Sequence, residues 1–295
     1  MNKVAVLIPC YNEEKTISEV VAEYKAALPD STVYVYDNNS SDNTYNVAKE
    51  AGAIVRREEY QGKGNVIRRM FADIEADAYL LVDGDMTYDS SVANLMINKL
   101  IDNKLDMVIC ARSEVSGSAY RLGHKFGNYF FTKTVGKIFG KKISDILTGY
   151  KALSRRFVKT FPVHGSGFDI EHEFTVHALE MRLPIAEITT EYFPRPDGSE
   201  SKLSTYKDGI KILFSIFKLT FTEKPLISFS IVSLFLLLIG TTWGWFYVVY
   251  PWILTGIIVA LPSAILATGL IILSFLIFLT GLIIQATKRH RKESF

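Results

Sequence analysis

Two aspartates separated by one glycine end an apolar run in the first half of the chain. Asp83 and Asp85 stand directly after YLLV (79–82), which has the composition of a buried strand. Neighbouring carboxylates repel each other, and apolar surroundings make their ionisation harder still. A divalent cation relieves both effects, because Mg²⁺ and Mn²⁺ take carboxylate, water and phosphate oxygens as ligands. The DGD pair therefore predicts a site for Mg²⁺ or Mn²⁺ and a diphosphate, although a solvated turn has the same composition.

Polar residues also follow two other apolar runs. Asp37 ends TVYVYD (32–37) and is placed to accept the N–H of a nucleobase. YNEE (11–14) follows the run VAVLIPC, NNSSDNT (38–44) follows Asp37, and QGKG (61–64) adds a flexible loop with one cation. Each stretch alone is ordinary turn chemistry. Together they predict one binding site, provided that the apolar runs are strands of one sheet.

The apolar runs alternate with helical patterns. We expect strands at 4–9, 32–37, 53–57, 79–83 and 106–111. We expect helices at 17–28, 44–51 and 65–75, with Asn12 as the N-cap of the first. Alternation predicts an α/β domain with a mostly parallel sheet covered on both faces, and such sheets bind ligands beyond the carboxyl ends of their strands. The chain contains neither GxGxxG nor GxxxxGK[ST], so neither a dinucleotide fingerprint nor a P-loop explains this edge.

Composition divides the 295 residues into a charged front part and an apolar tail. Charged residues are 22% overall, yet none lies between Lys224 and Lys288. A formal charge of +2 without a long basic run argues against a nucleic-acid partner. Cys10 and Cys110 each end an apolar run, which suits buried thiols in a reducing compartment. With no secretory signal at its start, the front part is expected in the cytosol.

The uncharged tail is long enough for two membrane crossings, since one crossing takes roughly 20 apolar residues. We place them at about 226–247 and 263–285, with Pro251 and Pro262 in the connection or kinking the second helix. Lysines and arginines at both outer ends, including KRHRK (288–292), predict that both termini face the cytoplasm. The segment 207–221 has the pattern of an amphipathic helix, either in the headgroup layer or in a core. The predicted organisation is a cytosolic domain at 1–205, an interfacial helix at 206–224, a multi-pass membrane part at 225–287 and a basic tail at 288–295.

The motifs PCYNEE, DNNSSDNT, GKG and DGD, in this order and spacing, resemble the inverting GT-A glycosyltransferases of family 2. DILTGYKALSRR (145–156), GFDIEHE (167–173) and RPDGSESKL (195–203) are similar to the branch that includes dolichyl-phosphate mannose synthase and bacterial polyprenyl-phosphate glycosyltransferases. The resemblance implies transfer of a hexose from a nucleotide diphosphate sugar to a polyprenyl phosphate. From its bacterial character we expect UDP-glucose or UDP-N-acetylglucosamine rather than GDP-mannose, and undecaprenyl phosphate as acceptor. It further implies a lipid-linked product for cell-envelope glycans that a flippase would take up, and a homo-oligomer joined through membrane segments.

The resemblance also assigns roles to residues of this sequence. The metal ligands would be Asp83 and Asp85, and the catalytic residues Asp85, Asp145 and Arg121. The nucleotide sugar would contact Pro9, Tyr11, Asn12, Glu13, Asp37, Lys63, Asp83 and Gly84. Phosphates of donor or acceptor would contact Arg112, Arg121, Arg195, Ser201 and Lys202. The segment RPDGSESKL would form a mobile loop that closes over the donor.

Two departures and two alternatives accompany this assignment. Asn38 stands where many relatives have a second aspartate, and Thr87 where the mannose synthase type has glutamine. A processive membrane polysaccharide synthase would share the catalytic domain, but the chain lacks that group's QxxRW motif and additional spans. A catalytically inactive scaffold would not need both DGD carboxylates together with Arg195 and Lys202.

Overall fold

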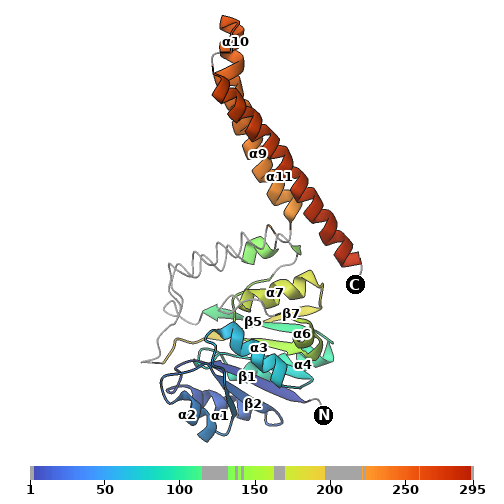
Figure 1. Ribbon diagram of the computed structural model, residues 1–295. Helices are drawn as coiled ribbons and strands as arrows, with labels where there is room; N and C mark the ends of the chain where they lie inside the picture. Colours follow the sequence, from blue (N-terminus) through green and yellow to red (C-terminus); the bar gives the residue numbers. More distant parts are fainter. Residues whose placement is uncertain are drawn as a thin grey trace. The chain divides into compact units, whose positions relative to one another are not determined.

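The computed structural model describes residues 3–114, 132–136, 139–140, 143–162, 170–196, 221, 224–258 and 260–293 (Figure 1). The chain forms two compact units, Met1–Ile212 and Leu213–Phe295. The expected interfacial helix at 206–224 lies outside the described residues except for Phe221 and Lys224.

The first unit is built on a seven-stranded sheet in the order β3-β2-β1-β4-β6-β5-β7. The strands are β1 (Val4–Cys10), β2 (Thr32–Asp37), β3 (Ile54–Arg57), β4 (Ala78–Leu81), β5 (Met107–Glu114), β6 (Lys151–Ser154) and β7 (Ile185–Tyr192). β1, β2, β3 and β4 pair in parallel, β5 pairs in parallel with β7, and β6 runs antiparallel between β4 and β5. The expected mostly parallel sheet is confirmed. The strand order reverses direction at β1, because β2 and β3 lie on one side of it and β4 lies on the other.

Alternate residues of the strands face two separate helical layers. Val6, Ile8 and Leu80 belong to a buried cluster with residues of α1 (Ile17–Ala27) and α4 (Ala93–Asp102). On the other face α3 (Lys63–Asp73), α6 (Arg155–Thr160) and α7 (Ile170–Glu180) contribute aromatic side chains that pack together. Helices therefore cover both faces of the sheet (Figure 1). The short helices α2 (Thr44–Glu50) and η1 (Ser90–Val92) complete the unit.

Two local expectations need correction. Asn12 does not cap the first helix, because α1 begins at Ile17 with Thr16 as its N-cap, while the Asn12 side chain accepts a hydrogen bond from Ser41 N. The predicted strand 79–83 ends at Leu81, so Asp83 lies on the turn that follows it. Strands β6 and β7 were not predicted. The β-branched run of β7 (IAEITTEY) was a readable signal, whereas β6 has four residues and begins with a lysine.

The second unit is a pair of long helices. α9 (Pro225–Gly244), the π-helical segment η2 (Trp245–Val249) and α10 (Tyr250–Thr255) form one helical run, and α11 (Leu261–Glu293) packs along it (Figure 1). Pro251 therefore lies inside the first run and Pro262 in the first turn of α11, so neither lies in the connection or in the interior of the second helix, where the sequence predicts them. The reversal follows Gly256, whose φ of 71° is left-handed and favours glycine.

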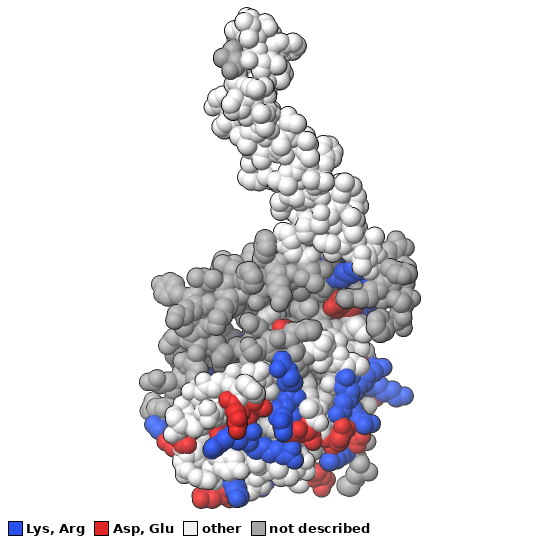
Figure 2. Space-filling view, in the orientation of Figure 1, with Lys and Arg blue, Asp and Glu red and all other residues white. Residues whose placement is uncertain are grey.

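Small residues bring the two helices together. A Cβ atom at Gly240 would lie 3.1 Å from side-chain atoms of Ile271 and Leu270, and one at Gly281 would lie 2.6 Å from Phe229 Cβ. Small residues at a helix interface let two backbones approach closely. Such close packing helps helices to associate in lipid, where the hydrophobic effect does not drive them together. Both helical runs are long and apolar enough to cross a membrane. The large apolar side chains of these two helical runs are mostly exposed. The charged side chains visible in Figure 2 belong mainly to the first unit.

Candidate active site

The DGD turn follows β4 at the centre of the sheet, beside the carboxyl end of β1. A Cβ atom at Gly84 would lie 2.8 Å from Cys10 Sγ, and the Gly84 carbonyl accepts a hydrogen bond of 2.6 Å from Thr16 Oγ1. Met86 then adopts a left-handed φ of 57°. The glycine between the acids is therefore explained by packing against β1.

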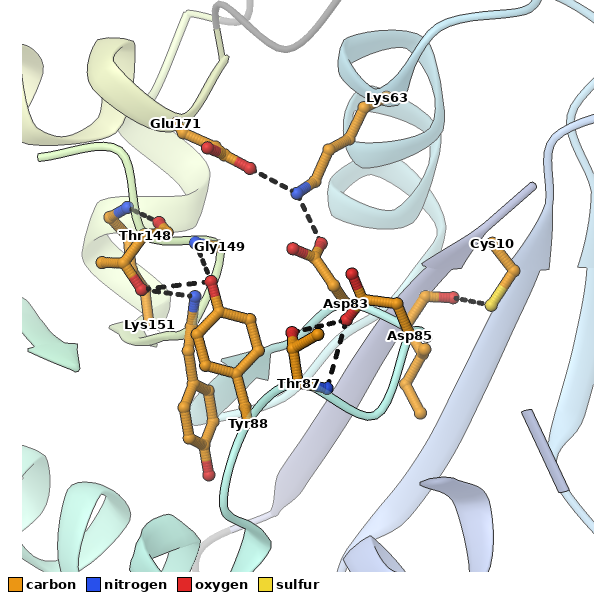
Figure 3. A network of polar contacts seen from close by, with 12 residues as sticks. Cys10, Lys63, Asp83, Asp85, Thr87, Tyr88, Thr148, Gly149, Lys151 and Glu171 are labelled. Atoms are coloured by element: carbon orange, nitrogen blue, oxygen red, sulfur yellow. Dashed lines mark hydrogen bonds and ion pairs between the residues drawn. The ribbon is translucent and has the colours of Figure 1, made fainter. Parts of the chain in front are cut away.

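Asp83 forms one end of a buried charge network (Figure 3). Lys63 Nζ, at the start of α3, donates to Asp83 Oδ1 at 2.5 Å and to Glu171 Oε1, in the first turn of α7, at 2.6 Å. The Lys63 side chain is 8% exposed. A Cβ atom at Gly149 would overlap the Asp83 carboxylate, so a side chain there would displace this acid. Asp83, Lys63 and Glu171 are thus brought together from three elements.

Asp85 lies deeper than Asp83 and has different partners. Its Oδ1 accepts a hydrogen bond of 2.6 Å from Thr87 Oγ1, and its Oδ2 accepts one of 2.5 Å from Arg195 Nη2. The Asp85 side chain is 5% exposed, whereas that of Arg195 is 27% exposed. Arg195 follows β7 and is the residue that brings the start of the RPDGSESKL motif to Asp85.

Burial and neighbouring charges have the net effect of raising the pKa values of Lys63 and Asp85 above their usual values. Burial lowers the pKa of Lys63, but the carboxylates of Asp83 and Glu171 outweigh it and hold the pKa above its usual value. Burial, followed by the charge of Asp83, raises the pKa of Asp85, although Arg195 and Thr87 act against this rise. The DGD turn therefore concentrates negative charge that requires cations.

The two acids fit a divalent cation that receives its remaining ligands from elsewhere. Among the described residues, no group of three or more His, Cys, Asp and Glu side chains is arranged to hold a metal ion. Asp83 and Asp85 nevertheless supply hard oxygen donors on one turn, and after burial the charge of Asp83 is the next cause that raises the pKa of Asp85. One or two carboxylates with water and phosphate oxygens is the ligand set that Mg²⁺ usually takes.

The loops after β1 and β2 are joined by hydrogen bonds. Asn12 N donates to Ser40 Oγ at 2.9 Å, and Glu13 N donates to Thr44 Oγ1 at 2.8 Å. Pro9 pairs with Tyr36 across the two strands, and partly buried Tyr11 begins the loop after β1. The residues expected at the nucleotide therefore share this edge of the sheet.

Asp37 is fully buried. Its Oδ1 accepts a hydrogen bond from Ser40 N at 3.3 Å, and its Oδ2 pairs with Arg57 Nε at 3.2 Å. The Arg57 guanidinium lies 5.2 Å from the centre of the Tyr45 ring and is half exposed. Arg57 is therefore a charged neighbour of the predicted base contact that the sequence did not indicate.

Asn38 holds the loop that leads to Lys63. Its Nδ2 donates to the carbonyls of Glu58 at 3.2 Å and Tyr60 at 2.8 Å, and its Oδ1 accepts from Gly62 N at 2.7 Å. An aspartate would lack the donor for both carbonyls. The departure from the family pattern at this position therefore has a structural role.

Arg112 and Asp145 form a nearly buried pair with each other. Arg112 Nε donates to Asp145 Oδ2 at 2.6 Å, Nη2 donates to Oδ1 at 2.9 Å, and Leu147 N donates to Oδ1 at 3.2 Å. The guanidinium also lies 5.3 Å from the centre of the Tyr192 ring. Asp145 is thus engaged on both oxygens, and Arg112 meets a carboxylate where the sequence suggested a phosphate.

A buried lysine outside the predicted site residues lies close enough to Glu171 and Asp145 for their charges to act on it. Lys151, at the start of β6, donates to the Thr148 carbonyl, and burial lowers its pKa to about 8. Tyr88 OH accepts a hydrogen bond of 2.8 Å from Gly149 N and so holds the 148–151 segment in place (Figure 3). A lysine that interrupts an apolar run was the signal for this position.

The expected residues Arg121, Ser201 and Lys202 lie outside the described part of the chain.

A mostly parallel sheet with an acid pair beyond its central strand is the architecture of a GT-A glycosyltransferase. The chain belongs to glycosyl transferase family 2, whose model matches residues 5–161.

Two relatives and one solved structure extend this assignment. Glycosyltransferase AglJ of Haloferax volcanii is 32% identical over 256 residues, which cover 86% of this chain and 84% of that protein. A dolichol-phosphate mannosyltransferase of Pyrococcus furiosus is 27% identical over 266 residues, covering 83% of this chain and 72% of that protein. Glucosyl-3-phosphoglycerate synthase from Mycobacterium tuberculosis, solved with Mn²⁺, uridine diphosphate and glucosyl-3-phosphoglycerate, matches with a TM-score of 0.59 at 20% identity, covering 73% of this chain and 80% of that one. At this identity the structural match concerns the fold.

Proposed function

We propose that this glycosyltransferase moves a hexose from a uridine diphosphate sugar to a polyprenyl phosphate, with inversion and with a divalent metal. One observation carries the proposal: Asp83 and Asp85 lie together at the carboxyl edge of the sheet, each bonded to a cationic side chain. Two neighbouring carboxylates with cationic side chains beside them suit a metal-bound diphosphate. The names of the Pyrococcus relative and of the Mn²⁺ and uridine diphosphate complex support the acceptor and the cofactor.

The acceptor needs little activation. A phosphate monoester has a second pKa near 6, so its attacking oxygen is largely anionic at neutral pH. That oxygen would attack the anomeric carbon on the face opposite the diphosphate, while the bond from this carbon to the diphosphate oxygen breaks. The bidentate pairing of Asp145 with Arg112 accords with a reaction that does not require a strong general base.

The residues of this chain would mainly position the reactants and balance charge. Lys63 and Arg195 supply positive charge where the diphosphate departs. Asp83 and Asp85 would hold the metal, which when bound stabilises negative charge on the leaving group. Glu171 keeps Lys63 in place, and the loops around Asn12 would hold the nucleoside.

The helix pair would place this reaction at a membrane. We expect both termini to face the cytoplasm, because Lys224 precedes the first helical run and Lys288 begins the basic end of the second. A cysteine introduced at Ile257, in the reversal between the helices, should react with a membrane-impermeant maleimide in intact cells, whereas one at Ser294 should react only after lysis. The opposite labelling pattern would exclude this orientation.

A transfer assay on the full-length protein in detergent tests the proposal. We expect a lipid-linked product from a uridine diphosphate sugar and undecaprenyl phosphate, and loss of that product with a metal chelator. Asp85→Ala should lower transfer at least about 100-fold, since it removes charge stabilisation at the leaving group. Asp102→Asn, an exposed acid at the end of α4, is the control and should remain active. Full activity of Asp85→Ala with chelator present would refute the metal site, and product on a hydroxyl acceptor alone would refute the phosphate acceptor.

A thermal-shift panel with Mn²⁺ would identify the donor. A bound donor raises apparent stability by mass action, by about 2.7 kcal/mol at a concentration 100 times its Kd. We expect a larger shift with UDP-glucose or UDP-N-acetylglucosamine than with GDP-mannose. A larger shift with GDP-mannose would instead assign a mannose donor.

A further inference from the structure

Both DGD carboxylates are already bonded to a cation of the chain itself. Lys63 Nζ lies 2.5 Å from Asp83 Oδ1, and Arg195 Nη2 lies 2.5 Å from Asp85 Oδ2. The two cations differ in their surroundings. Lys63 is 8% exposed and is held between Asp83 and Glu171, whereas Arg195 is 27% exposed. Moving Lys63 would leave two carboxylates without their cation, so Arg195 is the one that can leave at lower cost.

Asp85 cannot keep this partner and bind a divalent cation in the same way. Its Oδ1 accepts the Thr87 hydroxyl and its Oδ2 accepts Arg195. A divalent cation ligated by Oδ2 would lie within a few ångströms of the guanidinium that now donates to the same oxygen. Two positive groups at that separation also repel each other strongly in a buried setting. The metal and Arg195 therefore compete for Asp85.

We propose that Arg195 is an internal counter-ion of Asp85 that a diphosphate draws away, so that the site binds metal and diphosphate cooperatively. This inference rests on the proposed use of a nucleotide diphosphate donor. A guanidinium binds phosphate oxygens in a bidentate manner, so the diphosphate gives Arg195 a new partner when the metal takes Asp85. Because coupling between two ligands is reciprocal, each one raises the affinity for the other by the same factor.

Competition between Arg195 and the metal should lower the affinity for the metal when no diphosphate is present. Without a diphosphate, metal binding must break the Arg195–Asp85 pair and leave a cation beside the metal, so affinity is low. Arg195→Gln removes this cost and leaves Asp85 without its cation next to Asp83. We therefore expect Arg195→Gln to bind Mn²⁺ alone at least about five-fold more tightly, the lower end of typical coupling factors.

The experiment is a Mn²⁺ titration of the full-length protein in detergent, with free Mn²⁺ measured by electron paramagnetic resonance. Each variant is titrated alone and with saturating uridine diphosphate. In Arg195→Gln, the factor by which uridine diphosphate raises Mn²⁺ affinity should fall by at least about five-fold. Arg195→Lys keeps the positive charge at Asp85 and should keep the low affinity for Mn²⁺ alone, but it loses the bidentate geometry toward phosphate. Arg155→Gln is the matched control, because Arg155 is exposed and pairs with Glu75.

The outcomes separate this inference from the proposed function. Unchanged Mn²⁺ affinity in Arg195→Gln would mean that Arg195 serves only the phosphates, and weaker affinity would mean that it only supports Asp85; either result overturns the inference. Cooperative thermal unfolding of Arg195→Gln at the wild-type midpoint shows that the variant is folded. If wild-type protein binds no Mn²⁺ even with uridine diphosphate, the proposed function itself fails.

Discussion

Asp83 and Asp85 are two residues apart but lie in different surroundings. Asp83 is a quarter exposed and is bonded to Lys63, whose second partner is Glu171. Asp85 is nearly buried and is bonded to Thr87 and Arg195. The spacing of DGD places two acids on one turn, but three distant segments determine which cation each acid meets.

Gly84 is required by packing rather than by backbone conformation. A Cβ atom there would lie 2.8 Å from Cys10 Sγ, so Gly84→Ala should lower the free energy of unfolding by about 1–3 kcal/mol through overpacking. Cys10→Ala removes the sulfur, and the double variant should recover part of this loss. The check is the unfolding midpoint of the full-length protein in denaturant. Equal losses in the single and double variants would show that the sulfur is not the cause.

Lys151 should make stability depend on pH in a defined window. Burial lowers its pKa to about 8 in the folded state, against about 10.4 in an unfolded chain. Between these values the unfolded chain binds the additional proton, so stability rises with pH; below about pH 8 the cost of the buried charge is fully present.

Lys151→Met should therefore lack this rise. Relative to the variant, wild-type protein should gain stability on the order of 3 kcal/mol between pH 7 and pH 10.4, since each pKa unit corresponds to about 1.4 kcal/mol. Denaturant unfolding at several pH values measures it. Lys25→Met is the control, because the Lys25 ammonium is exposed and bonded to the Gly52 carbonyl at 2.7 Å. Parallel pH curves for wild type and Lys151→Met would contradict the burial argument.

At the scale of elements, the site depends on loops that fix one another after consecutive strands. The loop after β1 is bonded to the loop after β2, and Asn38 connects the end of β2 to the loop before α3. Lys63 stands at the start of α3. A change at Asn38 should therefore reach the charge network through the position of this helix.

Asn38→Asp should weaken both the loop and donor binding. The variant loses two donated hydrogen bonds and places a carboxylate oxygen beside two carbonyls, which should lower the free energy of unfolding by about 1–3 kcal/mol. Uridine diphosphate affinity with Mn²⁺ should fall as Lys63 loses its fixed position. Asn98→Asp, an exposed position in α4, is the control for both measurements. If Asn38→Asp is destabilised but binds uridine diphosphate with wild-type affinity, the loop held by Asn38 does not influence the site.

At the scale of the whole molecule, the chain consists of two units with different surfaces. The α/β unit has a buried core and a charged surface, whereas the helix pair exposes large apolar side chains along most of its length. Exposed apolar surface of this extent suits a lipid environment. The two units should therefore respond separately to mutation.

Gly281→Leu should disturb the helix pair and leave nucleotide binding intact. Its side chain would collide with Phe229, whose Cβ lies 2.6 Å from the position of a Cβ at Gly281. Gly269→Leu is the matched control, because no atom lies within 4 Å of a Cβ there. Limited proteolysis in lipid nanodiscs should cut the second unit faster in Gly281→Leu only, while uridine diphosphate binding stays unchanged in both. Equal proteolysis of the two variants would contradict close packing at Gly281.

Much of the fold was predictable because its signals are local. The runs that became β1 to β4 and the helices between them have clear periodicity, and a charge-free tail predicts long apolar helices. β6 was missed because its four residues carry no such pattern; its place between β4 and β5 depends on pairing with strands far away in sequence. The N-cap assignment of Asn12 was wrong because α1 begins only at Ile17, and the Asn12 side chain instead accepts a hydrogen bond from Ser41 N.

The sequence alone determined the class of protein, the acid pair and the apolar tail, because residue type, spacing and length carry that information. Only the tertiary structure decided the partners: Arg57 on Asp37, Lys63 and Glu171 at Asp83, Arg112 on Asp145 and Arg195 on Asp85. Ion pairs of this kind join residues 20 to 110 positions apart. Their formation depends on how strands and helices meet at one edge of the sheet, which no local pattern encodes.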